Sequence, residues 1–345
     1  MEALSSLLRP FAAMGAGAPA PMAAVASALS AVAIAAGTFA TAMALRGLRA
    51  SILLTPRARN LLADFAPTVG IAVGTALSAL FAGYGVAVSR LEVPLAFGTS
   101  SGRPWLVNLL ETPAWARWAA AVPALMATIL IYMDQNITSR LINNNRESRL
   151  VKGEGYHLDM LVISAVTFLS SLLGLPWLVA ATVRSLSHLK SLTNEPGRAG
   201  GPAVVEQRLT NFSIHALIGA AIVFFPGALR LIPRPALMGL FMYLGVTSIK
   251  GNGFLERCPL LLVGDAAAVR HPEGAAYADL PLRTVNTFTL IQVAALCALW
   301  GLKSSPIGIL FPVLIAGLHW PVRTHVAGRM IDAAALEKLD PPDAL

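Results

Sequence analysis

Charged residues are scarce in this sequence. Only 13% of its 345 residues are Asp, Glu, Lys or Arg, whereas 56% are hydrophobic. Water-soluble domains carry about 25% charged residues, so this balance is too apolar for one of ordinary composition. Acids are the rarer sign, with 18 against 26 basic residues, and the basic excess lies in short loops between apolar runs. There it sets orientation across a membrane and does not indicate a nucleic-acid partner. The composition predicts a polytopic protein whose surroundings are the lipid bilayer.

Cysteine and the common catalytic motifs are also missing or rare. Cys258 falls in a predicted loop and Cys297 in an apolar run, so the pair provides neither a disulfide framework nor a metal-ligand spacing. No P-loop, no His-Glu-x-x-His motif and no Cys-x-x-Cys pair is present. We therefore expect no enzyme activity, no cofactor and no bound metal. Transport without covalent chemistry is the simplest class.

Apolar runs bounded by charge, proline or glycine indicate about nine membrane segments by the length criterion. They lie near residues 22–45, 65–88, 118–144, 156–175, 177–190, 209–231, 235–249, 284–301 and 304–322. A helix needs about 20 apolar residues to cross a bilayer. The runs 177–190 and 235–249 are therefore too short to cross alone.

The charges of the loops predict an orientation. The segment 46–59 holds four arginines and no acid, so we expect it in the cytoplasm, and the basic segment 146–152 agrees with that side. The segment 90–117 is long and sparsely charged, which favours the exterior.

The stretch GLPWLVAATVRSLSHLKSLT (174–193) has the features of half a helix. Gly174 and Pro176 should end the preceding helix, because proline lacks an amide hydrogen and clashes with the turn before it. A new helix then begins between Trp177 and Thr182. Its amino-terminal end carries unpaired amide hydrogens and roughly half a positive charge, which makes an anion site at membrane depth, and Arg184 lies close to it. The alternative is a proline-kinked span whose arginine reaches the lipid headgroups.

Asp134 is the most unusual polar residue inside a predicted span, since an ionisable group there costs several kcal/mol. Thr138 follows four residues later, so carboxylate and hydroxyl share one helix face, which can line a cavity opposite Arg184. A structural alternative is a buried Asp134–Arg184 ion pair without contact to substrate.

His157 and Asp159 stand at a helix start, where a capping or interfacial role is expected.

Several segments together resemble the bicarbonate transporter family, which includes anion exchangers and sodium-bicarbonate cotransporters. The resemblance is colinear, and the order and spacing of the segments carry it. The segments are GTFATAMALRGLRAS (37–51), RARNLLADFAPTVGIAV (57–73), MDQNIT (133–138), KGEGYHLDM (152–160), GLPWLVAATVRSLSHLKSLT (174–193), EQRLTN (206–211), IPRPALMGLFMYLGVTSIKGNGFLER (232–257) and LRTVNTFTLIQVAALCALW (282–300).

The resemblance implies an all-α integral membrane fold of two inverted seven-segment repeats. In it a core domain moves against a gate domain, and two half-helices meet at a midplane anion site. The first run here resembles the sixth of about fourteen segments, so we expect the opening five, with the partner half-helix, to be missing. Carried over by position, the family's substrate site falls on Asp134, Thr138, Thr182, Val183 and Arg184.

The same resemblance divides the chain into six parts. They are an N-terminal loop remnant (1–21), gate helices (22–88), an exterior loop (89–117), core helices with the half-helix near 177–190 (118–231), further gate helices (232–322) and a cytoplasmic tail (323–345). It also implies a homodimer formed through gate segments, and a plasma membrane location.

Three functions are compatible with these residues. The first is exchange of bicarbonate for chloride, because Arg184 in ATVR resembles electroneutral exchangers and its fixed charge should repel sodium. The second is sodium-coupled bicarbonate cotransport, because Asp134 in MDQNIT resembles the sodium-coupled members. The third is a membrane-embedded interaction subunit or an incomplete, non-transporting product.

Overall fold

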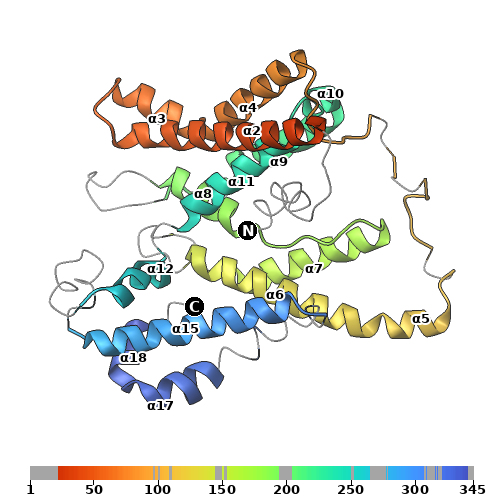
Figure 1. The fold of residues 1–345 in the computed structure, drawn as a ribbon. Coiled ribbons are helices and arrows are strands. Elements are labelled where there is room, and N and C mark those ends of the chain that lie inside the picture. The colour runs from red at the N-terminus through yellow and green to blue at the C-terminus, as the bar shows by residue number, and fades with distance from the viewer. Residues whose placement is uncertain are drawn as a thin grey trace. The chain divides into compact units, whose positions relative to one another are not determined.

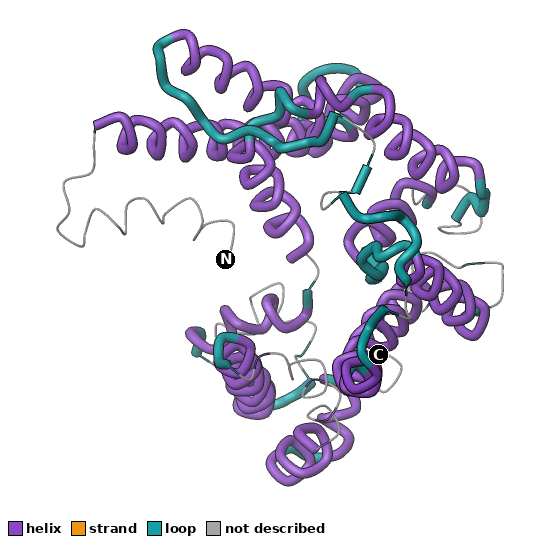
Figure 2. Tube along the Cα trace, turned by 90° about the vertical axis from the view of Figure 1, so that its right-hand side faces the viewer, coloured by secondary structure: helices purple, strands orange, loops and turns teal. Residues whose placement is uncertain are grey.

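The computed structural model of the protein consists of helices joined by loops in the residues that it describes. These are residues 22–95, 98, 99, 102–108, 111–143, 150, 154–193, 204–249, 252–264, 277, 279–306, 308, 315, 317 and 321–340. Within these ranges the only β-type pairing consists of two isolated bridges, Arg90 with Pro233 and Thr193 with Val204. Figure 2 accordingly shows helices joined by loops. The all-α prediction is confirmed for this part of the chain.

Contacts between residues divide the chain into two compact units. The first comprises Met1–Gly98 and Arg208–Lys250, and the second Thr99–Gln207 and Gly251–Leu345. These boundaries differ from those of the predicted core and gate, which are defined by movement and not by contacts. The core-and-gate division stays a prediction.

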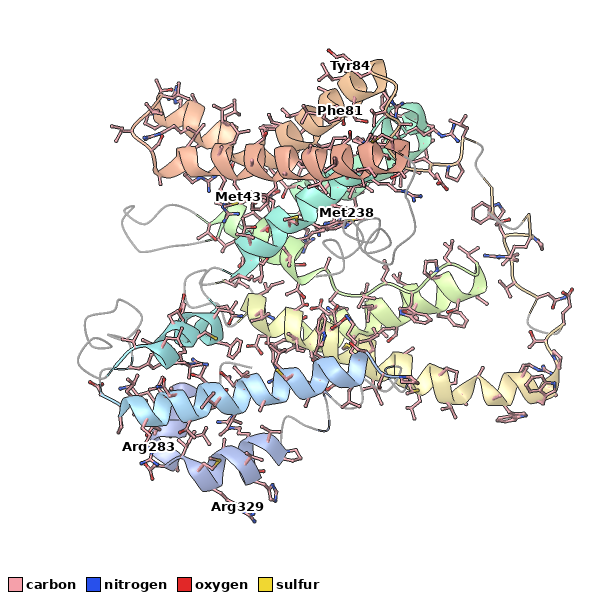
Figure 3. All side chains as sticks on the ribbon, viewed as in Figure 1. Met43, Phe81, Tyr84, Met238, Arg283 and Arg329 are labelled. Atoms are coloured by element: carbon pink, nitrogen blue, oxygen red, sulfur yellow. The ribbon has the colours of Figure 1, made fainter. Side chains whose placement is uncertain are left out.

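The first unit is built on three helices of apolar and small residues. They are α2 (Met22–Gly47), α4 (Ala66–Gly83) and α11 (Arg234–Ile249). Four further elements complete the unit: η1 (Leu48–Ala50), α3 (Pro56–Asp64), α9 (Leu209–Phe224) and α10 (Pro226–Leu229). Figure 1 shows α3 and α4 beside α2, with α11 crossing it. Figure 3 labels Met43 on α2 and Met238 on α11 near this crossing.

Glycines allow α2, α4 and α11 to approach closely. A Cβ placed on Gly239 would collide with the backbone carbonyl oxygen of Ala35, and one on Gly74 would lie 2.8 Å from the Cβ of Ala236. Thr38 of α2 lies between both glycines and is fully buried. Small residues at helix crossings are typical of membrane proteins, where close packing replaces the hydrophobic driving force.

The predicted cytoplasmic loop 46–59 contains the start of a helix. Thr55 caps α3 by accepting a hydrogen bond from the amide of Ala58 at 3.4 Å, and Pro56 occupies the first helical position. Threonine followed by proline is a common helix start, so the start of α3 can be predicted from the sequence.

The second unit contains the candidate site and the carboxyl-terminal helices. Its elements are α5 (Ala114–Ala119), α6 (Ala121–Asn143), α7 (Tyr156–Leu172), α8 (Thr182–Leu192), α12 (Gly253–Arg257), η2 (Cys258–Leu262), α15 (Leu282–Lys303), η4 (Val322–Ala327), α17 (Gly328–Met330) and α18 (Ala333–Leu339). Arg283 on α15 and Arg329 on α17 are both exposed (Figure 3).

The predicted cytoplasmic tail forms part of a packed cluster. Leu336 and Leu339 of α18 pack with Val285 and Phe288 of α15 and with Leu260 of η2. Beside this cluster Arg257 is buried, with 5% of its surface exposed. Its guanidinium donates hydrogen bonds to the hydroxyl of Tyr277 at 3.1 Å and to the side-chain oxygen of Gln292 at 2.7 Å. The described part of the tail is therefore docked on α15.

Four described helical stretches are long and apolar enough to cross a membrane: Ala24–Ala50, Ala66–Gly83, Ala114–Asn143 and Leu282–Lys303. Tyr156–Leu172 and Leu209–Phe224 are shorter apolar helices. The two runs predicted to be too short form α8 with 11 residues and α11 with 16. The loop remnant 1–21 and most of the run 304–322 lie outside the described residues.

Candidate functional site

The helix before the predicted half-helix ends at the predicted glycine. Gly174 has a left-handed backbone with φ of 60°, a conformation that favours glycine. Its amide donates to the carbonyl of Ser171 at 3.1 Å, and the amide of Leu175 donates to the carbonyl of Ser170 at 2.8 Å. This pair of bonds is the Schellman arrangement, which closes a helix and turns the chain away from its axis.

The chain then runs without helical structure from Leu175 to Ala181, and α8 begins at Thr182. We call residues 175–181 the lead. The carbonyl of Ala181 accepts the first helical hydrogen bond, from the amide of Ser185 at 2.9 Å. Alanine has no side-chain oxygen to cap the helix, so the amides of Thr182 and the two residues after it have no partner from the helix itself. The predicted start between Trp177 and Thr182 is confirmed.

A threonine pair joins the start of α8 to α6. The hydroxyl oxygens of Thr138 and Thr182 lie 2.6 Å apart, and the side chain of Thr138 is buried, with 5% exposed. This contact brings together two of the residues assigned to the site. They belong to different helices and lie 44 positions apart in the sequence.

Asp134 lies one helical turn before Thr138 on α6, about 6 Å along the helix axis. It is half-buried. Because residues four apart share a helix face, Asp134 lies on the same face of α6 as Thr138, which contacts α8. The carboxylate and the open helix start therefore belong to one region of the second unit.

Arg184 is exposed, and among the described residues no ion pair joins it to Asp134. The alternative in which these two residues form a buried ion pair is therefore not what the structure shows. Val183, between Arg184 and Thr182, is also exposed, with 43% of its surface accessible. The side chains of Val183 and Arg184 at this end of α8 are thus accessible.

A second polar contact, which the sequence did not predict, joins α6 to α7. The hydroxyl of Ser139 donates to a carboxylate oxygen of Asp159 at 3.4 Å, and it accepts from the side-chain amide of Gln135 at 3.3 Å. Asp159 was expected to have a capping or interfacial role; it lies in the first turn of α7, but Gly155 occupies the cap position and no side chain caps it, so the capping role is not what the structure shows. Ser139 directly follows Thr138, so consecutive residues of α6 contact α8 and α7.

This arrangement suits the binding of a small anion. Unpaired amides at a helix start carry partial positive charge, and Arg184 adds a full one. No group of three or more His, Cys, Asp or Glu side chains among the described residues is arranged to hold a metal ion. Asp134 and Thr138 offer single oxygen groups to a cation.

Apolar helices of membrane-crossing length, a broken helix and an ionisable residue inside a span together define an integral membrane protein of the transporter type. The family model of the HCO3- transporter integral membrane domain matches residues 11–344. The chain therefore belongs to the bicarbonate transporter family.

Relatives of two kinds match the chain at nearly equal identity. Human anion exchange protein 4 is 41% identical over 81% of this chain. The pig electrogenic sodium bicarbonate cotransporter 1 is 40% identical over 82% of it, and the mouse electroneutral sodium bicarbonate exchanger 1 is 38% identical over 81%. These relatives are transporters and not enzymes.

The chain is much shorter than these relatives. The aligned part covers 29% of the human anion exchange protein 4 and 26% of each of the other two.

Proposed function

We propose that this chain is a secondary transporter that exchanges bicarbonate for chloride by alternating access. The observation that carries the proposal is the open start of α8, held against α6 by the Thr138–Thr182 contact at 2.6 Å. A bicarbonate or chloride ion would accept hydrogen bonds from the amides of Thr182, Val183 and Arg184. The fixed start of the helix means that this binding needs no rearrangement of the backbone.

The charge of Arg184 favours exchange over cotransport with sodium. An arginine is protonated at every physiological pH, so it supplies the positive charge that a bound cation would otherwise bring. Two like charges at about 4 Å repel each other by about 4 kcal/mol near a protein surface. Sodium at Asp134 would therefore be disfavoured whenever Arg184 faces the same cavity.

Further parts of the proposal rest on family membership. We propose a core containing α6, α7 and α8 that moves against a gate containing α2, α4, α11 and α15, with the protein as a homodimer in the plasma membrane. In the inverted-repeat fold of fourteen segments, the anion would also contact a second half-helix.

The decisive experiment is recovery of intracellular pH after an acid or base load in cells that express this chain. Bicarbonate buffer is present while external chloride is replaced by gluconate. We expect bicarbonate-dependent recovery that follows external chloride and is abolished by Arg184→Ala. Arg208→Ala, an exposed arginine of the other unit, serves as control. Undiminished flux in Arg184→Ala at equal surface expression would overturn the assignment of Arg184.

Sodium-coupled bicarbonate cotransport is the second candidate, and the position of Asp134 one turn from Thr138 favours it. The carboxylate and the hydroxyl are oxygen ligands of the kind that sodium prefers. Replacement of all external sodium by N-methylglucamine tests it. Flux that stops without sodium and is lost in Asp134→Asn would support cotransport, whereas unchanged flux would exclude it.

The third candidate is a membrane-embedded interaction subunit or an incomplete, non-transporting product. The chain aligns with less than a third of each relative. Surface-expressed protein without any bicarbonate-dependent pH response would support this candidate against both transport hypotheses.

A further inference from the structure

The carboxyl-terminal end of α7 is held by a segment far away in the sequence. Arg103 donates through one guanidinium nitrogen to the carbonyl of Leu173 at 3.1 Å and to that of Gly174 at 2.7 Å. The amide of Val107 donates to the carbonyl of Leu172 at 2.9 Å. All three bonds come from the segment 102–108, within the predicted exterior loop 89–117.

These bonds complete the hydrogen bonding of the helix end. The carbonyls of Ser170 and Ser171 are used by the Schellman turn, and the next three are used by Val107 and Arg103. Every carbonyl from residue 170 to residue 174 therefore has a donor. The arginine also places its positive charge at the negative end of the helix dipole, which is a favourable position.

The contact between Arg103 and Gly174 is tight. A Cβ on Gly174 would lie 2.5 Å from a terminal guanidinium nitrogen and 2.6 Å from the guanidinium carbon. The segment around Arg103 is itself ordered by local bonds, since its carbonyl accepts from the hydroxyl of Thr99 at 2.7 Å. Gly102, directly before it, has a left-handed φ of 69°. These contacts hold the guanidinium of Arg103 against Gly174.

The lead begins where Arg103 binds and ends at the candidate site. Gly174 directly precedes the lead, and Thr182 directly follows it and contacts Thr138. Between its first and last residues the lead has no helical structure, so its path depends on how its two ends are fixed. Arg103 fixes the first end and Thr138 the second.

We propose that Arg103 is a positioning residue for the anion site. It holds the start of the lead so that the amides of Thr182, Val183 and Arg184 stay at the place where the anion binds. This inference rests on the proposed function, and it assigns a role in that site to a residue of the predicted exterior loop. Arg103 need not touch the anion itself.

The test compares Arg103→Gln with Arg117→Gln in the full chain. Arg117 is an exposed arginine of the same predicted loop and has no described contact with α7, so its substitution removes the same charge without releasing the lead. Arg103→Lys retains a charged donor that can reach the carbonyls, and it should recover most of the wild-type behaviour. Comparison of these variants distinguishes the effect of losing the hydrogen bonds from the effect of losing the charge.

The first readout is chemical and needs no transport. Cys258 and Cys297 are replaced by alanine, Ala180 in the lead by cysteine, and the rate of labelling with a small thiol reagent is measured in membranes. We expect labelling to accelerate about fivefold in Arg103→Gln, because the lead then leaves its fixed position most of the time. Labelling in Arg117→Gln should match that of the parent.

The second readout is bicarbonate affinity, from protection of the cysteine introduced in the lead against labelling and from the apparent KM of flux. If the binding-competent position is occupied only about a fifth of the time, both constants rise about fivefold while the maximal rate per surface molecule changes less. A merely structural role would lower the amount of folded protein and leave the affinity of the remainder unchanged.

Each outcome has a defined meaning. Faster labelling together with weaker bicarbonate protection supports the proposal, even if the chain shows no flux. Faster labelling with unchanged affinity overturns the role of Arg103 in the anion site. Labelling and affinity equal to those of Arg117→Gln overturn the proposal as a whole, and neither result alters the separate test of Arg184.

Discussion

The hydroxyls of Thr138 and Thr182, 2.6 Å apart, are the direct side-chain contact between α6 and the first residue of the half-helix. The contact is largely shielded from water, since Thr138 is buried. A hydrogen bond in such a place stabilises the protein by about 1 kcal/mol, and a hydroxyl left without its partner costs more.

Replacement of either threonine by valine should therefore lower stability. We expect Thr138→Val and Thr182→Val each to cost about 1–2 kcal/mol, and the double variant to cost less than the sum, because the second replacement removes the unpaired hydroxyl. Thermal unfolding of the wild type, the two single variants and the double variant, each purified in detergent, measures this double-mutant cycle. Thr167→Val is the matched control, since the Thr167 hydroxyl is buried without a described partner. Additive effects would show that the two hydroxyls do not interact.

The crossing of α2, α4 and α11 predicts a strong dependence on glycine. Gly239→Ala would push a methyl group against the Ala35 carbonyl, whose backbone cannot yield locally. Overpacking of this kind costs about 1–3 kcal/mol. In Gly219→Ala, on α9, the added methyl group meets no atom within 4 Å, so the helix should be unaffected or slightly stabilised. Equal unfolding midpoints for the two variants would contradict the close packing.

Gly174 and Gly85 provide a comparison between two left-handed glycines. Both have positive φ, 60° and 79°, so alanine at either position costs roughly 1–2 kcal/mol of backbone strain. Only Gly174 is covered by the Arg103 guanidinium, whereas Gly85 has open space. Gly174→Ala should therefore destabilise the protein more than Gly85→Ala in thermal unfolding. In Arg103→Gln the difference should shrink, and a difference that persists would mean that another neighbour causes it.

The docking of α18 should depend on pH through Asp279. Lys338 donates to the Asp279 carboxylate at 2.5 Å, and this hydrogen bond and the lysine charge hold the pKa of Asp279 below its usual value. A lowered folded-state pKa means that the contact stabilises the protein above the ordinary aspartate pKa of about 3.9 and is lost as pH falls through the folded value.

Asp279→Asn should thus lower the unfolding midpoint slightly at pH 7, and its effect should diminish as pH falls through the folded-state pKa and the wild-type carboxylate becomes protonated. The effect is small because the pair is exposed to solvent. Glu337→Gln, next to Lys338 on the exposed side of α18, removes a charge without a described contact and serves as the control at pH 7. A difference between wild type and Asp279→Asn that stays constant down to acid pH would contradict the assignment.

Local chemistry explains why much of the fold could be predicted. The scarcity of charge and the length of the apolar runs indicate a membrane protein, because the bilayer excludes exposed backbone and unpaired charge. Gly174 and Pro176 indicate the end of α7, because only certain residues tolerate that backbone, and the same rule places the start of the next helix between Trp177 and Thr182. The colinear segments identified the family for the same reason, since each is a local pattern.

Contacts between distant segments could not be predicted in this way. Nothing local to Arg103 indicates that it binds the carbonyls of Leu173 and Gly174, which lie 70 and 71 positions away in the sequence. The Ser139–Asp159 bond was likewise missed, because a serine beside a threonine on a helix does not reveal which neighbour it meets.

By itself, then, the amino-acid sequence determined that this protein is helical, lies in a membrane and breaks a helix before Thr182, since these follow from hydropathy and from the backbone limits of glycine and proline. Only the tertiary structure decided which groups hold that helix start: Thr138 at one end of the lead and Arg103 at the other. The physical reason is that hydrogen bonds between segments depend on distance in space, which spacing along the chain does not encode.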